Sequence, residues 1–118
     1  MNIHDEFINA CGSGDLATAK KCVRLGVDFH ASEERALRWA AYKGNLNIVK
    51  YLVNLGVNIH AMNDAAFLLA AEEGHLEIVK YFINLGVNVN IISDSLLRWL
   101  ECDRHLDVAE YLKSVIKK

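Results

Sequence analysis

The chain has 118 residues, with no proline and only three cysteines, Cys11, Cys22 and Cys102. Three is an odd number, and the spacing of the cysteines matches no paired metal motif. We therefore interpret them as reduced thiols of an intracellular protein, acting as small buried or half-buried hydrophobic side chains. Because the sequence has no linker or low-complexity tract, we expect one domain over residues 1–118.

Long apolar runs are also missing. No stretch approaches the roughly 20 residues that span a bilayer, and the start, MNIHDEFINACGSGD, lacks the apolar core of a signal peptide. The net charge is −2, with acidic and basic residues interleaved, which gives no general attraction for nucleic acid or an acidic membrane. We expect no nucleic-acid partner, no membrane partner and a cytoplasmic location.

What the sequence does contain is an internal repeat. Gly14, Gly44 and Gly74 lie 30 residues apart, and each is followed by x-Leu. The motif LGV recurs with the same period at 25–27, 55–57 and 85–87. We call positions that become equivalent when the repeats are aligned a column. Two such columns with the same period predict a repeat architecture, with units of about 1–31, 32–61, 62–91 and 92–118.

Each unit has the pattern of two helices followed by an extended segment. The second helix has one apolar face, as in Leu46, Val49, Leu52 and Val53. The first helix is rich in alanine, as in Ala36, Ala40 and Ala41, which favours close helix packing. Asn63 and Ser93 are predicted N-caps of the first helices, and Gly44 and Gly74 are predicted to end first helices with a positive φ. Trp39 and Trp99 share a column that we assign to the core, with a partner groove as the alternative for either one.

Stacking of such units buries a continuous core, so the outer faces of the end units must be polar. Glu6 stands where the inner repeats have alanine, and Lys113 stands where they have Val53 or Ile83. We therefore predict that residues 1–31 and 92–118 cap the stack, although a fragment of a longer array stays an alternative.

The segments GNLNIVKYLVNLGVNIHA (44–61) and GHLEIVKYFINLGVNVN (74–90) resemble the second half of an ankyrin repeat. The resemblance implies an all-α, ankyrin-type α-solenoid of about four helix-turn-helix repeats. It departs from the common unit of 33 residues, because the period is 30 and the usual opening is replaced by EERALR (33–38) and NDAAFL (63–68). We expect the hairpin tips to be shortened, or to be loops without strand pairing. The short unit is similar to ankyrin proteins of giant DNA viruses of amoebae, which would place the protein in host cytoplasm.

The resemblance implies a protein-interaction module that is not an enzyme, and whose unidentified protein partner binds on the concave side. Carried onto this sequence, the site comprises hairpin-tip residues and the ends of first helices: His30, His60, Met62, Ile92, Tyr42, Lys43, Glu72 and Glu73. Met62 and Ile92 occupy a column where the second repeat has polar Ser32, so they are either exposed anchors or local packing across the tip. We expect a monomer.

The histidines do not predict a metal site or a cofactor. Equivalent positions of stacked helices lie about 8–10 Å apart, whereas zinc holds its nitrogen ligands at about 2.0–2.1 Å. His30 and His60 are therefore expected to be polar loop residues, and His75 and His105 to cap backbone groups in the interhelix turns.

No phosphate loop, HExxH motif, CxxC motif or nucleophile elbow is present in the sequence. An enzyme would need an enclosed pocket with converging polar groups. Two further alternatives stay open from the sequence. One is an adaptor that recruits host ubiquitin or signalling machinery, and the other is a repeat fragment with no selected partner.

Overall fold

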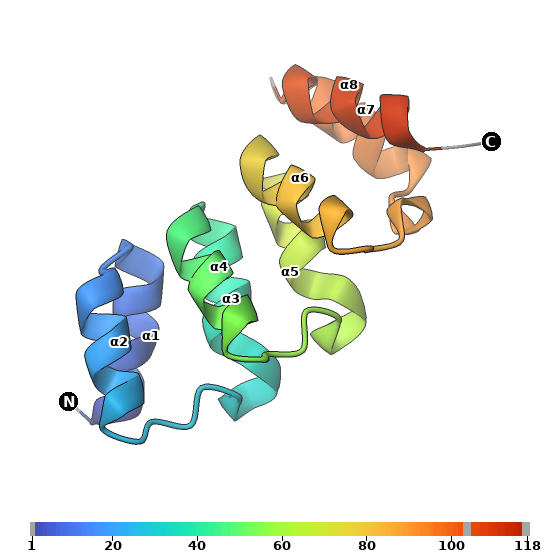
Figure 1. The fold of residues 1–118 in the computed structure, drawn as a ribbon. Helices are drawn as coiled ribbons and strands as arrows, with labels where there is room; N and C mark the ends of the chain where they lie inside the picture. The colour runs from blue at the N-terminus through green and yellow to red at the C-terminus, as the bar shows by residue number, and fades with distance from the viewer. Residues whose placement is uncertain (1, 103–104, 117–118) are drawn as a thin grey trace.

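The computed structural model describes residues 2–102 and 105–116, without the side chains at 32 and 33. Met1, residues 103–104 and residues 117–118, which belong to the predicted end units, lie outside the described residues. Within the described ranges there are eight α-helices and no strand. The helices are α1 (Ile3–Ser13), α2 (Leu16–Arg24), α3 (Ala31–Lys43), α4 (Leu46–Asn54), α5 (Ala61–Glu72), α6 (Leu76–Asn84), α7 (Asp94–Cys102) and α8 (Leu106–Val115), with a short 3-10 helix η1 (Val89–Ile91). They form four antiparallel pairs stacked from the N-terminus to the C-terminus (Figure 1). The predicted all-α, ankyrin-type solenoid is confirmed.

We call α1, α3, α5 and α7 the first helices, and α2, α4, α6 and α8 the second helices. Small side chains let the first helices approach closely, since Ala36, Ala40 and Ala41 on α3 are all buried. Larger side chains fill the space between the two helix columns, where the rings of Phe67 and Phe82 meet edge to face with centroids 6.4 Å apart. Burial of each large apolar side chain stabilises the stack by roughly 1.5–3 kcal/mol.

The tips between repeats are loops without strand pairing in the described ranges, as expected from the shortened unit. At each tip a short polar side chain closes the chain onto itself. Asp28 Oδ1 accepts the backbone N–H of His30 at 3.0 Å, and Asn58 Oδ1 accepts that of His60 at 3.0 Å. Such side-chain turns replace the hydrogen bonds that a longer hairpin would make between strands.

The turns inside the repeats tie each repeat to the one before it. Gly44 has a φ of +84°, as predicted, and a Cβ built there would stand 2.6 Å from His75 Cε1. His75 Nε2 donates to Tyr42 O at 2.9 Å, which confirms the predicted capping of backbone groups. In the preceding repeat Asn45 Nδ2 donates to Cys11 O and Gly12 O at 2.9 and 2.8 Å.

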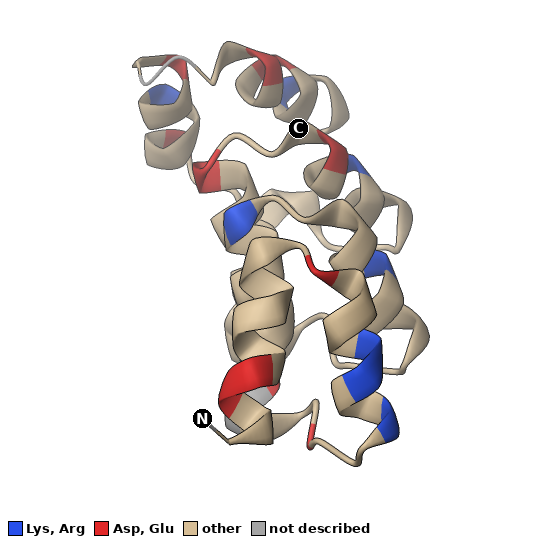
Figure 2. Ribbon diagram, turned by 90° about the vertical axis from the view of Figure 1, so that its left-hand side faces the viewer, with Lys and Arg blue, Asp and Glu red and all other residues tan. Residues whose placement is uncertain are grey.

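A second tie runs along the second helices. Lys20 lies over the ring of Tyr51, Lys50 over Tyr81 and Lys80 over Tyr111, at 5.8, 5.7 and 5.3 Å from the ring centroids. Figure 2 shows basic residues, Lys and Arg in blue, recurring along one side of the stack. Each contact is a cation–π interaction of about 0.5–1 kcal/mol at an exposed site.

The starts of the first helices differ from the prediction in one repeat. Ser93 caps α7, because its Oγ accepts the N–H of Leu96 at 3.0 Å. The predicted N-cap Asn63 is wrong: Met62, Asn63 and Asp64 form a left-handed turn with φ of 55°, 58° and 62°. The turn is closed by Asp64 N–H donating to His60 O, and His60 Nδ1 donating to Asp64 Oδ1.

Helix α7 packs less tightly on the stack than the other first helices do. Within the described residues α3 packs extensively on both α1 and α5, whereas α7 makes few contacts with α5. The second helix α8, in contrast, packs on α6 to the same extent as α6 packs on α4. The core assignment of Trp99 is accordingly wrong, since this side chain is 46% exposed.

Candidate functional site

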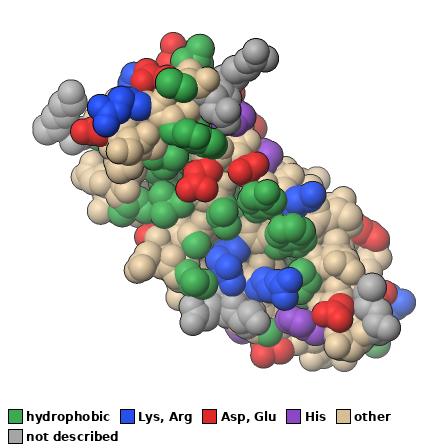
Figure 3. All heavy atoms as spheres, turned by 180° about the vertical axis from the view of Figure 1, so that it is seen from behind, with side chains coloured by type: hydrophobic (Ala, Val, Ile, Leu, Met, Phe, Trp, Pro, Cys, Tyr) green, Lys and Arg blue, Asp and Glu red, His purple; other side chains and the backbone are tan. Residues whose placement is uncertain are grey.

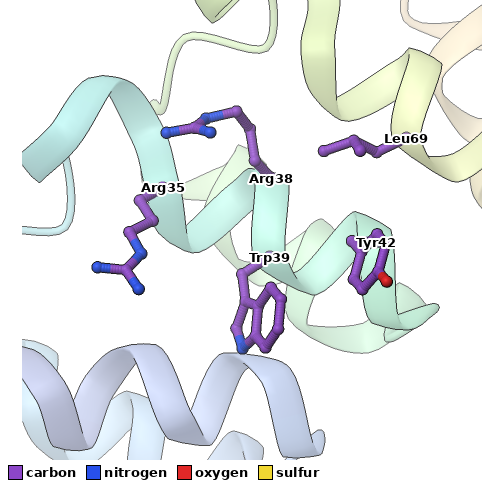
Figure 4. Close-up of a pocket in the computed structure, with 5 residues that line it drawn as sticks. All are labelled: Arg35, Arg38, Trp39, Tyr42 and Leu69. Carbon is purple, nitrogen blue, oxygen red and sulfur yellow. The ribbon is translucent and has the colours of Figure 1, made fainter.

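A shallow groove lies on the exposed side of the first helices. Its volume is about 370 Å³, and it is lined by Arg35, Arg38, Trp39, Tyr42 and Leu69 (Figure 4). Four of these residues are on α3, at positions three or four apart, which places their side chains on one face of the helix. Leu69 reaches in from α5, so the groove bridges two repeats.

The centre of the groove is aromatic. The rings of Trp39 and Tyr42 are stacked, with centroids 5.5 Å apart and planes inclined by 11°. Lys43 Nζ lies 5.6 Å from the centroid of the Trp39 ring, a cation–π contact. Trp39 and Tyr42 are 38% and 37% exposed, so the assignment of Trp39 to the core is wrong. The sequence indicated that Trp39 is exposed, because residues three apart share a helix face and Tyr42 was expected to be exposed.

Gly12 of α1 makes room for the indole. A Cβ at this position would stand 2.0 Å from Trp39 Nε1 and 2.6 Å from Trp39 Cδ1. The ring therefore lies directly on the backbone of α1, whose end is held by the hydrogen bond from Asn45 to Gly12 O. A neighbouring repeat thus positions the aromatic surface.

Charge is unevenly distributed around this centre. Arg35, Arg38 and Lys43 surround Trp39 on α3, whereas Glu72 and Glu73 follow Leu69 at the end of α5. Figure 3 shows the face of the first helices, on which apolar side chains form a broken band with basic and acidic side chains between them. We call the exposed side of α1, α3, α5 and α7 the first-helix face.

The structure distributes the other predicted site residues along the stack. Tyr42 and Lys43 belong to the groove, and Glu72 lies one helical turn beyond Leu69. Met62 is 53% exposed at the left-handed turn that opens α5. Of the two alternatives for Ile92, the structure favours local packing over an exposed anchor, because η1 turns the chain and Ile92 joins the core at 6% exposure.

His30 and His60 lie at the tips and are each paired within their own repeat. His30 Nδ1 donates to Glu34 Oε2 at 2.8 Å, and His60 Nδ1 donates to Asp64 Oδ1. Glu34 is buried, and its Oε2 also accepts the backbone N–H of Asn58 at 2.7 Å, which links α3 to the next tip. In the described part of the chain no group of three or more His, Cys, Asp or Glu side chains could hold a metal ion.

The cysteines have different surroundings. Cys11 and Cys22 are buried, and burial, together with the nearby Cys22, raises the pKa of Cys11 to about 12. Burial also raises the pKa of Cys22. Cys102 is exposed on α7, which corrects the expectation that it is buried or half-buried. The two buried thiols are thus held in their neutral form and act as small core side chains.

Comparison with known proteins bears on residues 7–93. These residues match the sequence model of the family described as ankyrin repeats (3 copies). No curated protein matches the chain. None of the helices in the described ranges has the length and apolarity that crossing a membrane requires.

Proposed function

Because the chain belongs to the ankyrin repeat family, whose members are generally protein-binding scaffolds, we propose that it binds a protein partner along the first-helix face. The single observation that supports this site is the stacked, half-exposed pair of Trp39 and Tyr42. Tryptophan and tyrosine are enriched among the residues that dominate binding energy at protein interfaces. A flat aromatic surface between two repeats suits recognition of another chain.

The groove chemistry supports binding rather than catalysis. Its lining consists of two arginines, two aromatic residues and one leucine. None of these five residues is a histidine, a carboxylate, a cysteine or a serine, the side chains that most often act as general bases or nucleophiles. We therefore propose that the chain acts through contact with a partner. We also propose that it acts as a monomer in the cytoplasm.

Within the proposed site, residues differ in their expected contribution. Trp39 and Tyr42 form the centre, with Lys43 against the indole and Leu69 across the groove. Met62 and Glu72 lie on the neighbouring helix α5, Glu73 follows its end, and all three would contact the edge of a partner. His30 and His60, already paired at the tips, would lie at the periphery, and buried Ile92 is not part of the surface.

Affinity capture from the source cells, read by mass spectrometry, tests this proposal. The wild-type chain is compared with the double variant Trp39→Ala/Tyr42→Ala. The control is Leu25→Ala, which removes a 65% exposed apolar side chain after a second helix. We expect a reproducible partner to be lost from the double variant alone, with unchanged helical circular dichroism in both. Full retention of every partner by a folded double variant would refute the site.

A further inference from the structure

We propose that the partner segment bound on the first-helix face is an amphipathic α-helix, which runs along the stack and contacts α3, α5 and α7 in turn. This inference rests on the proposed function, and it adds the conformation and the length of the partner. Its basis is the column formed by Trp39, Leu69 and Trp99, which recurs in three successive repeats.

The three residues of this column occupy the same place on their helices. The turn after each helix is closed by the same backbone hydrogen bond, at 3.0, 2.9 and 3.0 Å: from Asn45 to Ala40 O, from His75 to Ala70 O and from His105 to Leu100 O. The column lies one residue before each accepting carbonyl. Trp39 and Trp99 are 38% and 46% exposed, and Leu69 lines the groove between them in sequence. The first-helix face thus carries one large apolar side chain per repeat.

The groove alone is too small for a stable partner. Five residues line it, whereas each side of a standard protein interface contributes roughly 20–30 residues. A stable partner must extend beyond α3, and Met62 on α5 and Trp99 on α7 are further exposed apolar side chains. The stack is 46 Å long (Figure 1), which exceeds the roughly 30 Å of a helix of 20 residues.

The step from one repeat to the next matches two turns of an α-helix. Packed helices lie about 8–10 Å apart. Helix α7 is held further from α5, because Leu96 and Leu100 replace the alanines of the inner repeats. Residues i and i+7 of an α-helix lie about 10.5 Å apart on nearly the same face. In a β-strand the side chains of one face recur about every 6.8 Å, so they fall out of step with the repeats.

A helix also suits a face that offers no backbone partners. The described ranges contain no strand, so no sheet edge there can pair with the N–H and C=O groups of an extended segment. Burial of unpaired backbone groups is unfavourable. An α-helix satisfies these groups internally and can lie on apolar side chains without leaving them unpaired.

A polyproline II helix is the main alternative among peptides, because its turn of three residues spans about 9.3 Å. The width of the surface favours the α-helix. Trp39 and Tyr42 are one turn apart on α3, which lies across the stack, and their ring centroids are 5.5 Å apart. The apolar stripe of an amphipathic helix is at least about 100° wide, with neighbouring side chains about 5–6 Å apart, so it covers both rings. A polyproline II helix presents a single row of side chains on each face, which covers one of them.

A lipid surface is the other alternative, because tryptophans also anchor proteins at membranes. Elements that lie on membranes carry a continuous apolar face flanked by lysine and arginine. Here charges of both signs interrupt the apolar band, among them Glu72 and Glu73 at the end of α5 (Figure 3). These charges favour a partner that contacts the band in separate places.

The test uses labelled 21-residue peptides and the full chain. The helical probe carries leucine at positions i, i+3, i+7, i+10 and i+14, with alanine, glutamine, glutamate and lysine elsewhere. The scrambled probe has the same composition with its leucines spread around the helix, and the short probe ends after i+7. Two further peptides have proline at every third position or alternate leucine with threonine. Binding is measured by anisotropy, and co-sedimentation tests vesicles of phosphatidylcholine with and without phosphatidylserine.

We expect the helical probe to bind at least about tenfold more tightly than the scrambled, proline and alternating probes. Trp39→Ala should weaken both the helical and the short probe about tenfold, as for truncation of an anchoring side chain. Trp99→Ala should weaken the helical probe by a similar factor. It should leave the short probe unchanged, which also shows that this variant is folded. The control Leu25→Ala removes a 65% exposed apolar side chain after a second helix and should change neither.

Equal binding of the helical and scrambled probes would overturn the inference, and so would helical binding that depends on Trp39 but not on Trp99. Tighter binding of the proline or alternating probe, lost in Trp39→Ala, would overturn the helix while leaving the site. Binding to vesicles and to no peptide would overturn it in favour of a lipid surface. If no probe binds, the helix is overturned, and Trp39-dependent capture of a partner from the source cells would still support the proposed function. Peptide binding unaffected by Trp39→Ala would overturn both.

Discussion

The indole of Trp39 rests on the backbone of Gly12, at a position where a Cβ would stand 2.0 Å from Nε1. The two residues lie in adjacent repeats, on α3 and α1. The exposed aromatic surface therefore depends on the absence of one methyl group in a neighbouring helix.

Replacement of Gly12 by alanine should displace this indole without unfolding the chain. The atoms that clash belong to a side chain that can rotate away, and alanine favours the helix by roughly 0.5–1 kcal/mol. We expect a shift in tryptophan fluorescence and weaker binding by the groove, with little loss of the free energy of unfolding measured in urea.

The double variant Gly12→Ala/Trp39→Ala provides the control. Once the indole is absent, the added methyl group meets no clash, and the alanine should stabilise α1 by roughly 0.5–1 kcal/mol relative to Trp39→Ala alone. If Gly12→Ala unfolds the chain, or leaves the fluorescence unchanged, the packing described here is incorrect.

Glu34 provides a second test, because its buried carboxylate joins two repeats. Glu34→Ala removes the acceptor of the Asn58 N–H and should lower the free energy of unfolding by about 1.5–3 kcal/mol, as for hydrogen bonds to charged groups. His30→Ala removes only the more exposed partner of the same carboxylate and should cost about 0–1 kcal/mol. Urea denaturation of both variants measures the difference, and equal losses would show that the link to Asn58 contributes nothing.

Gly44 and Gly56 form a matched pair, since both have a positive φ, of 84° and 94°. A Cβ at Gly56 meets nothing within 4 Å, whereas one at Gly44 meets the ring of His75 at 2.6 Å. Gly56→Ala should cost about 1–2 kcal/mol from the left-handed backbone alone. Gly44→Ala should cost about 1 kcal/mol more, because the displaced ring loses its hydrogen bond to Tyr42 O. Thermal or urea unfolding measures the loss of stability in each variant. Equal losses in Gly44→Ala and Gly56→Ala would contradict the prediction.

The repeat made much of this fold predictable. The period of 30 residues makes Gly74 the equivalent of Gly44 and places His75 directly after it, so the positive φ and the capping histidine follow from local chemistry repeated in register. The loops at the tips follow in the same way from the shortened unit.

The candidate site was less predictable, because exposure depends on how far each pair of helices lies from the next. Trp39 shares a column with Leu69 and Trp99, and the periodicity alone assigns a tryptophan to the core. Only the packing on Gly12 and the stack with Tyr42 place it at the surface. Ile92 shows the opposite case, since the turn η1 buries a residue whose column is exposed at Met62.

The left-handed turn at Met62 leads to a prediction that reverses the usual order of helix propensities. In a right-handed helix isoleucine is more favourable than glycine by several tenths of a kcal/mol. At a φ of 55° the order inverts, because a β-branched side chain is strained there and glycine is not. We expect Met62→Gly to be more stable than Met62→Ile by about 1 kcal/mol or more, as for a left-handed residue. Urea unfolding of the two variants measures this difference. Greater stability of Met62→Ile would show that α5 begins with a right-handed turn and that Asn63 can act as its N-cap after all.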